Sequence, residues 1–245
     1  MWAGNVNGFI GMLEANMDSA PLTQTQLLRL VAKRLLVIIP ALFALIFIPA
    51  GTLDYWEAWL YLAILFVPMI FVLLYLLKND PELLERRMRI REKETQQKQI
   101  LYVGVPLFIL IYMLPGLDKR FGWSDTPVAV VLLADLFVLL GYALIVIVFR
   151  ENSYAARTIA VDPGQKVISS GPYAFVRHPM YLGALLLYIL SPLALGSYWG
   201  MIPTLLLIPL FVSRIRSEEN VLTRDLPGYD AYRQKVRYRL LPGVW

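Results

Sequence analysis

Long apolar segments alternate with short polar ones along the chain. Six apolar runs stand out, at residues 35–50, 56–77, 100–116, 127–149, 181–196 and 198–212. A transmembrane helix needs about 20 apolar residues, a length that the second and fourth runs reach alone and the first and third reach with their flanks. The last two runs are short and separated only by Ser197, which predicts a helical hairpin. The pattern predicts an all-α, polytopic membrane bundle of about six helices.

Two polar stretches are expected to form helices on the cytoplasmic face. Residues 78–99 hold seven basic and five acidic residues, a density typical of a solvated helix with ion pairs between successive turns. A contact with anionic lipid head groups is the alternative. After a helix break at Pro227-Gly228, a second, amphipathic helix is predicted to extend to residue 240. Its apolar face consists of Tyr229, Tyr232, Val236 and Leu240.

The distribution of charge predicts the topology. The formal net charge is +5. With the N-terminus inside, 21 of the 23 basic residues lie in inward segments, and only Lys119 and Arg120 lie in outward loops. The inward segments are 1–34, 78–99, 150–180 and 213–245. Cytoplasmic loops of membrane proteins carry an excess of Lys and Arg, so this split predicts six crossings with both termini cytoplasmic. It also disfavours nucleic acid as the partner of the basic charge.

The amino-acid composition excludes several classes of protein and several kinds of reactive site. Hydrophobic residues make up 58% of the chain, which excludes a soluble globular domain, a coiled coil and a disordered chain. Cysteine is absent and His178 is the single histidine, so disulfides, a thiol nucleophile and a multi-histidine metal site are excluded. Residues 1–30 lack the features of a cleavable signal peptide. Residues 1–34 are expected to lie at the membrane surface or to be disordered.

Polar residues are concentrated in two segments, 150–183 and 213–245, which flank the short hairpin and fall on one side of the membrane. In the first, Gly171-Pro172 predicts a turn and Pro179 predicts the first residue of a helix. The free N–H groups of that helix start favour an anion such as a carboxylate. Gly183, one turn further, allows close approach of backbone or ligand.

In the second segment, Arg214 and Glu218 are four residues apart and share a face if the last apolar helix continues. Glu218 suits a cationic ligand and Arg214 an anionic one; the alternative is an ordinary surface ion pair. Likewise, His178 taken alone is better explained as a helix-capping or interfacial histidine than as a site residue. A pocket built from these segments has apolar walls and a charged mouth.

Three motifs together go beyond these separate interpretations. The stretches GPYAFVRHPMYLG, SEENVL and GYDAYRQKVRYRLLP, in this order and spacing, resemble the isoprenylcysteine carboxyl methyltransferase family and, more broadly, the integral-membrane methyltransferases that include phospholipid N-methyltransferases. The resemblance covers about 127–245, so we expect a methyltransferase-like core there. It is preceded by transmembrane helices over 35–126 and an interfacial segment over 1–34.

The resemblance implies that S-adenosylmethionine binds at the cytoplasmic ends of the last helices. The implied cofactor-binding residues are Gln165, Lys166, Val167, Ile168, Tyr173, His178, Pro179, Met180, Tyr181, Gly183 and Glu218. For a carboxylate acceptor, Arg214 and Arg237 are expected to hold the oxygens. For a lipid amine they would instead hold a phosphate, and Glu219 or a tyrosine would deprotonate the amine. The eukaryotic members often have His-x-Leu-Val where this chain has Gln165–Ile168.

Several functions are consistent with the sequence. We favour O-methylation of a lipophilic carboxylate. The acceptor is expected to be a small molecule or a lipidated chain that enters from the bilayer. No metal and no nucleic acid is expected to take part. Phospholipid or amine N-methylation and a sterol-reductase-like enzyme that uses NADPH are the alternatives. A non-catalytic scaffold or a transporter is also considered, because Asp135 lies inside an apolar run, where ionisable residues are functional candidates.

Overall fold

The computed structural model describes residues 22–88, 95–155, 159, 161–162 and 164–245, with side chains from residue 102 onward in the second of these ranges. This part of the chain is helical and contains no strand, which confirms the predicted fold class. The elements are α2 (Gln24–Ala50), α3 (Trp56–Asn79), α4 (Pro81–Met88), α5 (Thr95–Phe121), α6 (Val128–Glu151), η1 (Gly171–Ala174), α7 (Pro179–Ala194), α8 (Met201–Asp225) and α9 (Tyr229–Lys235).

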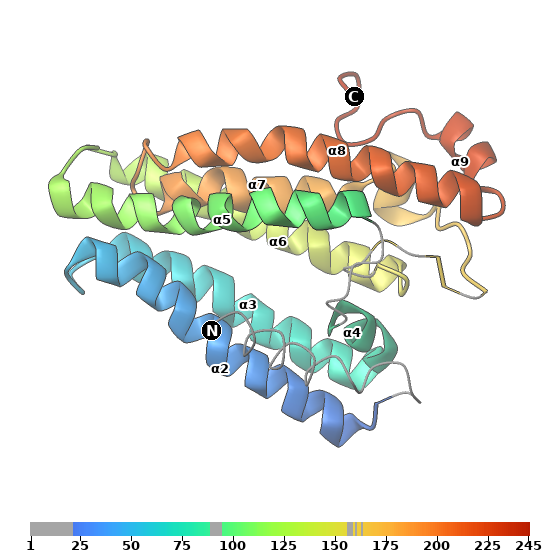
Figure 1. Ribbon diagram of the computed structural model, residues 1–245, viewed down its shortest axis with the longest axis horizontal. Coiled ribbons are helices and arrows are strands. Elements are labelled where there is room, and N and C mark those ends of the chain that lie inside the picture. Colours follow the sequence, from blue (N-terminus) through green and yellow to red (C-terminus); the bar gives the residue numbers. More distant parts are fainter. Residues whose placement is uncertain (1–21, 89–94, 156–158, 160, 163) are drawn as a thin grey trace, which may run out of the picture.

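The long helices form two groups. Helices α5, α6, α7 and α8 run side by side along the long axis, and the pair α2 and α3 is inclined to them (Figure 1). One end of the molecule carries the short connections between helices. The other end carries α4, α9 and the long polar connection between α6 and α7 (Figure 1). The polar segments therefore gather at one end of the bundle.

Within the described residues, four helices are long and apolar enough to cross a membrane: Gln24–Ala50, Trp56–Asn79, Tyr102–Phe121 and Val128–Glu151. Helix α7 is apolar but has only 16 residues. In α8 the apolar part ends near residue 212, and the helix continues as a polar extension to Asp225. These helices make the protein an integral membrane protein. The predicted short hairpin corresponds to α7 and the apolar part of α8.

Helix α2 begins well before the first apolar run because Thr23 caps it. The Thr23 side chain accepts a hydrogen bond from the Gln26 backbone, and the Gln26 side chain accepts one from the Thr23 backbone, which forms a capping box. The added turns bury Leu27 and Val31 in a cluster with α3 and α4. This burial explains why a partly polar stretch remains helical.

Two glycines allow α6 and α7 to pack closely. An ideal Cβ on Gly141 would lie 2.8 Å from the Gly183 carbonyl oxygen, and one on Gly183 would lie 2.7 Å from the Gly141 carbonyl oxygen. Small residues at such crossings let membrane helices approach backbone to backbone. Gly183 therefore allows a close backbone approach, as its sequence position predicts, and the backbone that approaches it is that of α6.

Helix α4 differs from the solvated helix predicted over 78–99. Its Leu83 and Leu84 are 0% and 1% exposed, because they pack among α2, α3 and the end of α6. Of the rest of the predicted helix, residues 89–94 lie outside the described residues, and residues 95–99 form the first turn of α5. Tertiary packing thus gives this charged segment a buried apolar face.

The second amphipathic helix is also shorter than predicted. It ends at Lys235, and the chain then continues without helix to the C-terminus. Val236 and Leu240 are nevertheless buried, since the extended tail folds back over α7 and α8. Asp135 is buried in α6, and neither of its carboxylate oxygens has a hydrogen-bond partner among the described residues.

Candidate functional site

A pocket lies at the polar end of the bundle, between the α6–α7 connection, the start of α7, the polar extension of α8, and α9. It encloses about 830 Å³, including the part open to solvent. The pocket is lined by Asn152, Tyr154, Ala155, Ile159, Gln165, Lys166, Val167, Ile168, Tyr173, Arg177, His178, Met180, Tyr181, Arg214, Glu218, Leu222, Leu226, Tyr229 and Tyr232.

The stretch from Gly171 to Pro179 brings several of these side chains together. Gly171 has φ +53°, a left-handed conformation that favours glycine, and it opens the single turn η1. Helix α7 then begins at Pro179, as its sequence predicts. The C-terminal tail fixes the link between them, because the N–H groups of Arg177 and His178 donate to the carbonyls of Tyr238 and Arg239, at 2.9 Å each.

Behind the pocket, Glu219 is the centre of a buried charged cluster. Its carboxylate accepts from Arg177 Nε at 2.7 Å and from Arg239 Nε at 2.8 Å, and His178 Nε2 lies 3.2 Å away. Glu219 is 3% exposed and Arg177 is 6% exposed. Arg177 also donates to the carbonyls of Val236 and Arg237. The cluster joins α8, the start of α7 and the tail.

These partners determine the protonation state of Glu219. Burial by itself would raise the pKa of this carboxyl, but the hydrogen bonds from His178, Arg177 and Arg239 outweigh it and lower the pKa to about 2. A base that accepts a proton near pH 7 needs a pKa near that value. Glu219 also does not line the pocket. The structure thus places this carboxylate behind the pocket, ionised at neutral pH and bound to two guanidiniums.

Glu218, Tyr181 and Arg214 form a second polar chain, and all three line the pocket. The Tyr181 hydroxyl donates to Glu218 Oε2 at 2.5 Å and accepts from Arg214 Nε at 3.0 Å. His178 lies between the two glutamates, with Nδ1 4.0 Å from Glu218 Oε1. One tyrosine thus holds a carboxylate and a guanidinium at the same pocket.

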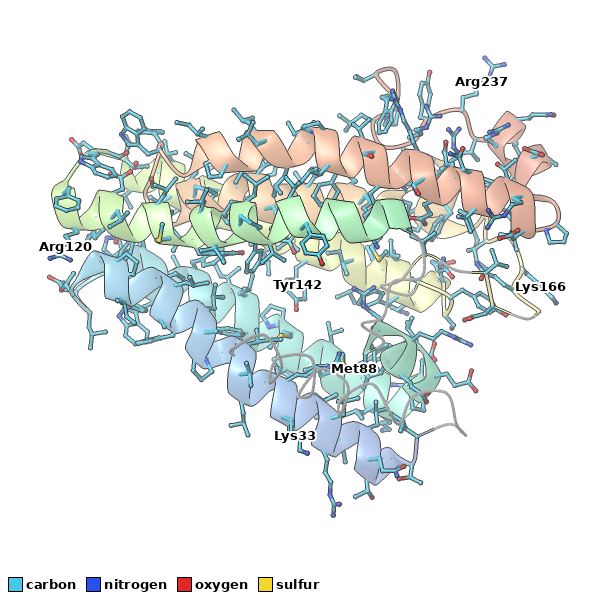
Figure 2. The ribbon with its side chains drawn as sticks, viewed as in Figure 1. Lys33, Met88, Arg120, Tyr142, Lys166 and Arg237 are labelled. Atoms are coloured by element: carbon cyan, nitrogen blue, oxygen red, sulfur yellow. The ribbon has the colours of Figure 1, made fainter. Side chains whose placement is uncertain are left out.

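The structure places most of the predicted site residues around this one pocket. Pro179, Gly183, Glu219 and Arg237 are the exceptions, since they do not line it. Pro179 starts α7, and Gly183 packs on α6. Arg237 is exposed on the tail, and its side chain extends away from the bundle (Figure 2). Arg239, two residues later, turns inward instead and binds Glu219.

Other residues of the site were missed from the sequence. One of them is Asn152, which lines the pocket and donates from Nδ2 to the hydroxyl of the predicted Tyr173 at 2.9 Å. Burial raises the pKa of Tyr173 to about 12. Tyr229 and Tyr232 line the pocket, although their spacing indicated only an apolar helix face. Arg177 lies inside the Gly171–Gly183 motif. Its position in that motif is the sequence feature that could have identified it as a site residue.

Helix α4 supports the pocket from the side of the N-terminal helices. Arg87 Nη1 donates to the Ala155 carbonyl at 3.0 Å and lies 3.4 Å from Met180 Sδ. Its guanidinium also lies over the Phe149 ring, 4.7 Å from the centroid. Ala155 and Met180 both line the pocket. The N-terminal part of the chain, which carries no recognised motif, therefore holds part of the pocket wall.

Fold and site together define a helical membrane protein with a pocket at one end that is lined by charged, aromatic and apolar side chains. In comparisons with known proteins, the sequence model of the isoprenylcysteine carboxyl methyltransferase (ICMT) family matches residues 131–224. The match runs from α6 to the end of α8, a little over a third of the chain, and contains most of the pocket. It confirms the resemblance seen in the motifs: over this segment the chain is similar to that family of membrane methyltransferases. No match was found among curated proteins.

The acidic side chains and the histidine of the site are engaged with one another and with arginines and a tyrosine. No group of three or more His, Asp or Glu side chains in the described part of the chain is arranged to hold a metal ion. Each candidate carboxylate at the site already contacts a tyrosine, a histidine or a guanidinium. The polar groups of the pocket are instead suited to an organic ligand that carries charges of both signs.

Proposed function

We propose that the protein transfers a methyl group from S-adenosylmethionine to the carboxylate of a lipophilic acceptor. The observation that carries this proposal is the Glu218–Tyr181–Arg214 chain, which presents a carboxylate and a guanidinium to one pocket. Glu218 suits the cofactor's ammonium group, and Arg214 suits the acceptor's carboxylate. The family match supports this choice of reaction.

The residues present fit such a cofactor. Apolar side chains such as Val167, Leu222 and Leu226 line the pocket beside the polar ones, a combination that is usual in cofactor sites. The Tyr229 hydroxyl is a buried polar group without a hydrogen-bond partner among the described residues. An organic ligand with hydroxyl and amino groups can supply that partner.

S-adenosylmethionine, when bound, supplies a methyl group on a sulfonium: an acceptor oxygen forms the new bond to carbon while the carbon–sulfur bond breaks and its electron pair stays on sulfur. The protein contributes binding and alignment. Alignment of reactants can lower a barrier by roughly 7–11 kcal/mol. A carboxylate acceptor is ionised at pH 7, so this reaction needs no general base. That requirement agrees with Glu219 being held as an ionised structural group.

The acceptor is proposed to enter from the bilayer and the cofactor from the cytoplasm. Arg214 lies two residues past the apolar part of α8, at the level where that helix becomes polar. A lipophilic acceptor whose tail remains among apolar helices can place an anionic head group there. With the 21 basic residues of the inward segments, this side of the protein is proposed to be the cytoplasmic side.

The experiment is calorimetric titration of S-adenosylhomocysteine into the detergent-purified protein, together with methyl transfer to two acceptors. We expect Glu218→Gln to weaken S-adenosylhomocysteine binding at least about tenfold, since it removes a charge partner of the ammonium. Arg214→Gln should retain that binding and lose transfer to an S-prenylated cysteine with a free carboxylate. Transfer to phosphatidylethanolamine instead would favour N-methylation, and binding of NADPH without S-adenosylhomocysteine binding would overturn the proposal.

A further inference from the structure

Tyr229 is the first residue of α9 and one of the most enclosed polar side chains of the pocket. It follows Gly228, whose φ of +87° turns the chain from α8 into α9. The residue is 4% exposed and packs in a cluster with Leu226, Tyr232 and Val236. Its hydroxyl has no hydrogen-bond partner among the residues that the structure describes.

Tyr232, one turn later on the same short helix, provides a direct comparison. Its ring lies 5.8 Å from that of Tyr229, and it is 7% exposed. Its hydroxyl donates to the Tyr173 carbonyl at 2.8 Å. Both tyrosines line the pocket, but one hydroxyl is bonded within the protein and the other is not.

A buried hydroxyl without a partner is unfavourable. Leaving such a group unsatisfied costs about 1–3 kcal/mol, so most buried polar groups in folded proteins are paired. Burial, followed by the charges of Glu219 and Glu218, raises the pKa of Tyr229. The phenol therefore keeps its proton at neutral pH and can donate a hydrogen bond as well as accept one.

We infer that the Tyr229 hydroxyl is a ligand-binding group that forms its hydrogen bond with a polar group of the bound cofactor. The inference rests on the proposed function, because it concerns the same pocket. In the ligand-free protein the unpaired hydroxyl is unfavourable, whereas in the complex it forms its hydrogen bond. Tyr229 thereby adds a cofactor contact from α9, beyond the residues 131–224 that the family model matches.

The test compares Tyr229→Phe with Tyr232→Phe, since each removes one hydroxyl and keeps the ring. We expect Tyr229→Phe to weaken S-adenosylhomocysteine binding about tenfold in calorimetry, while the melting temperature of the ligand-free protein stays the same or rises. Tyr232→Phe should lower the ligand-free melting temperature, because the Tyr173 carbonyl loses its donor.

Two results would overturn the inference. One is unchanged S-adenosylhomocysteine affinity in Tyr229→Phe when the wild type binds. The other is a ligand-free melting temperature that falls as far in Tyr229→Phe as in Tyr232→Phe, which would show that the hydroxyl is already bonded within the protein. A wild-type protein that does not bind S-adenosylhomocysteine would instead overturn the proposed function, and this inference with it.

Discussion

Arg177 and Glu219 form a buried ion pair, with 2.7 Å between Arg177 Nε and Glu219 Oε1 and both side chains 4% exposed. The pair connects the link before α7 to the polar extension of α8. Each residue has a neighbour in the chain that lines the pocket, His178 beside Arg177 and Glu218 beside Glu219. The buried pair therefore fixes the relative position of two pocket side chains that come from different helices.

Removing the charge of Glu219 should destabilise the protein. Glu219→Gln leaves the Arg177 and Arg239 guanidiniums without their anion, and breaking a buried ion pair in this way costs about 3–5 kcal/mol. Thermal unfolding in detergent measures the effect. The matched control is Glu82→Gln, which removes one half of an i,i+4 pair at a side chain that is 77% exposed, and it should change stability by less than about 1 kcal/mol. Equal melting temperatures for the two variants would contradict the structural role of Glu219.

The same carboxylate predicts a pH dependence. Its pKa is lowered from 4.5 to about 2 in the folded protein, so its contribution to stability is fully present above about pH 4.5 and is lost as the pH falls toward 2. The difference in melting temperature between wild type and Glu219→Gln should therefore be largest above that pH and shrink below it. Melting curves recorded between pH 7 and pH 3 test this. A difference that grows as the pH falls would be inconsistent with the lowered pKa.

Adding a methyl group at the α6–α7 crossing should force the two helices apart. The Cβ of Gly183→Ala would lie 2.7 Å from the Gly141 carbonyl oxygen, and overpacking of this kind costs about 1–3 kcal/mol. Gly104→Ala in α5 is the control, since its Cβ meets no described atom within 4 Å. That variant should be neutral or slightly stabilising, because alanine favours a helix more than glycine does. Melting temperatures of both variants test this prediction, and a Gly183→Ala variant as stable as Gly104→Ala would contradict it.

Arg87 is predicted to be a positioning residue for the pocket. Arg87→Gln should weaken S-adenosylhomocysteine binding about tenfold through the displaced Ala155 and Met180, and Arg87→Lys should restore part of it. Arg29→Gln, at an exposed position on α2, is the control and should bind as the wild type does. Hydrogen–deuterium exchange of the segment around Met180 gives a readout that does not depend on the ligand. Unchanged affinity and unchanged exchange in Arg87→Gln would show that Arg87 does not position the pocket.

Much of the fold follows from short-range information in the sequence. The apolar runs determined the membrane-spanning helices, because about 20 apolar residues are favourable in a bilayer only as a helix. The His178-Pro179 step determined the start of α7, since proline has no N–H to lose at that position. The Gly171–Gly183 motif and Glu218 located most of the residues that the structure brings around the pocket.

Only the tertiary structure decided which of two adjacent glutamates faces the pocket. Neighbouring residues on a helix point in directions about 100° apart, and the path of the C-terminal tail places Arg239 on Glu219 and leaves Glu218 at the pocket. The same tail carries Arg237 outward. The burial of α4 and the contacts of Arg87 also depend on segments distant in the chain. Helical periodicity and turn chemistry are local and can be predicted from sequence, whereas such long-range contacts depend on how the helices pack.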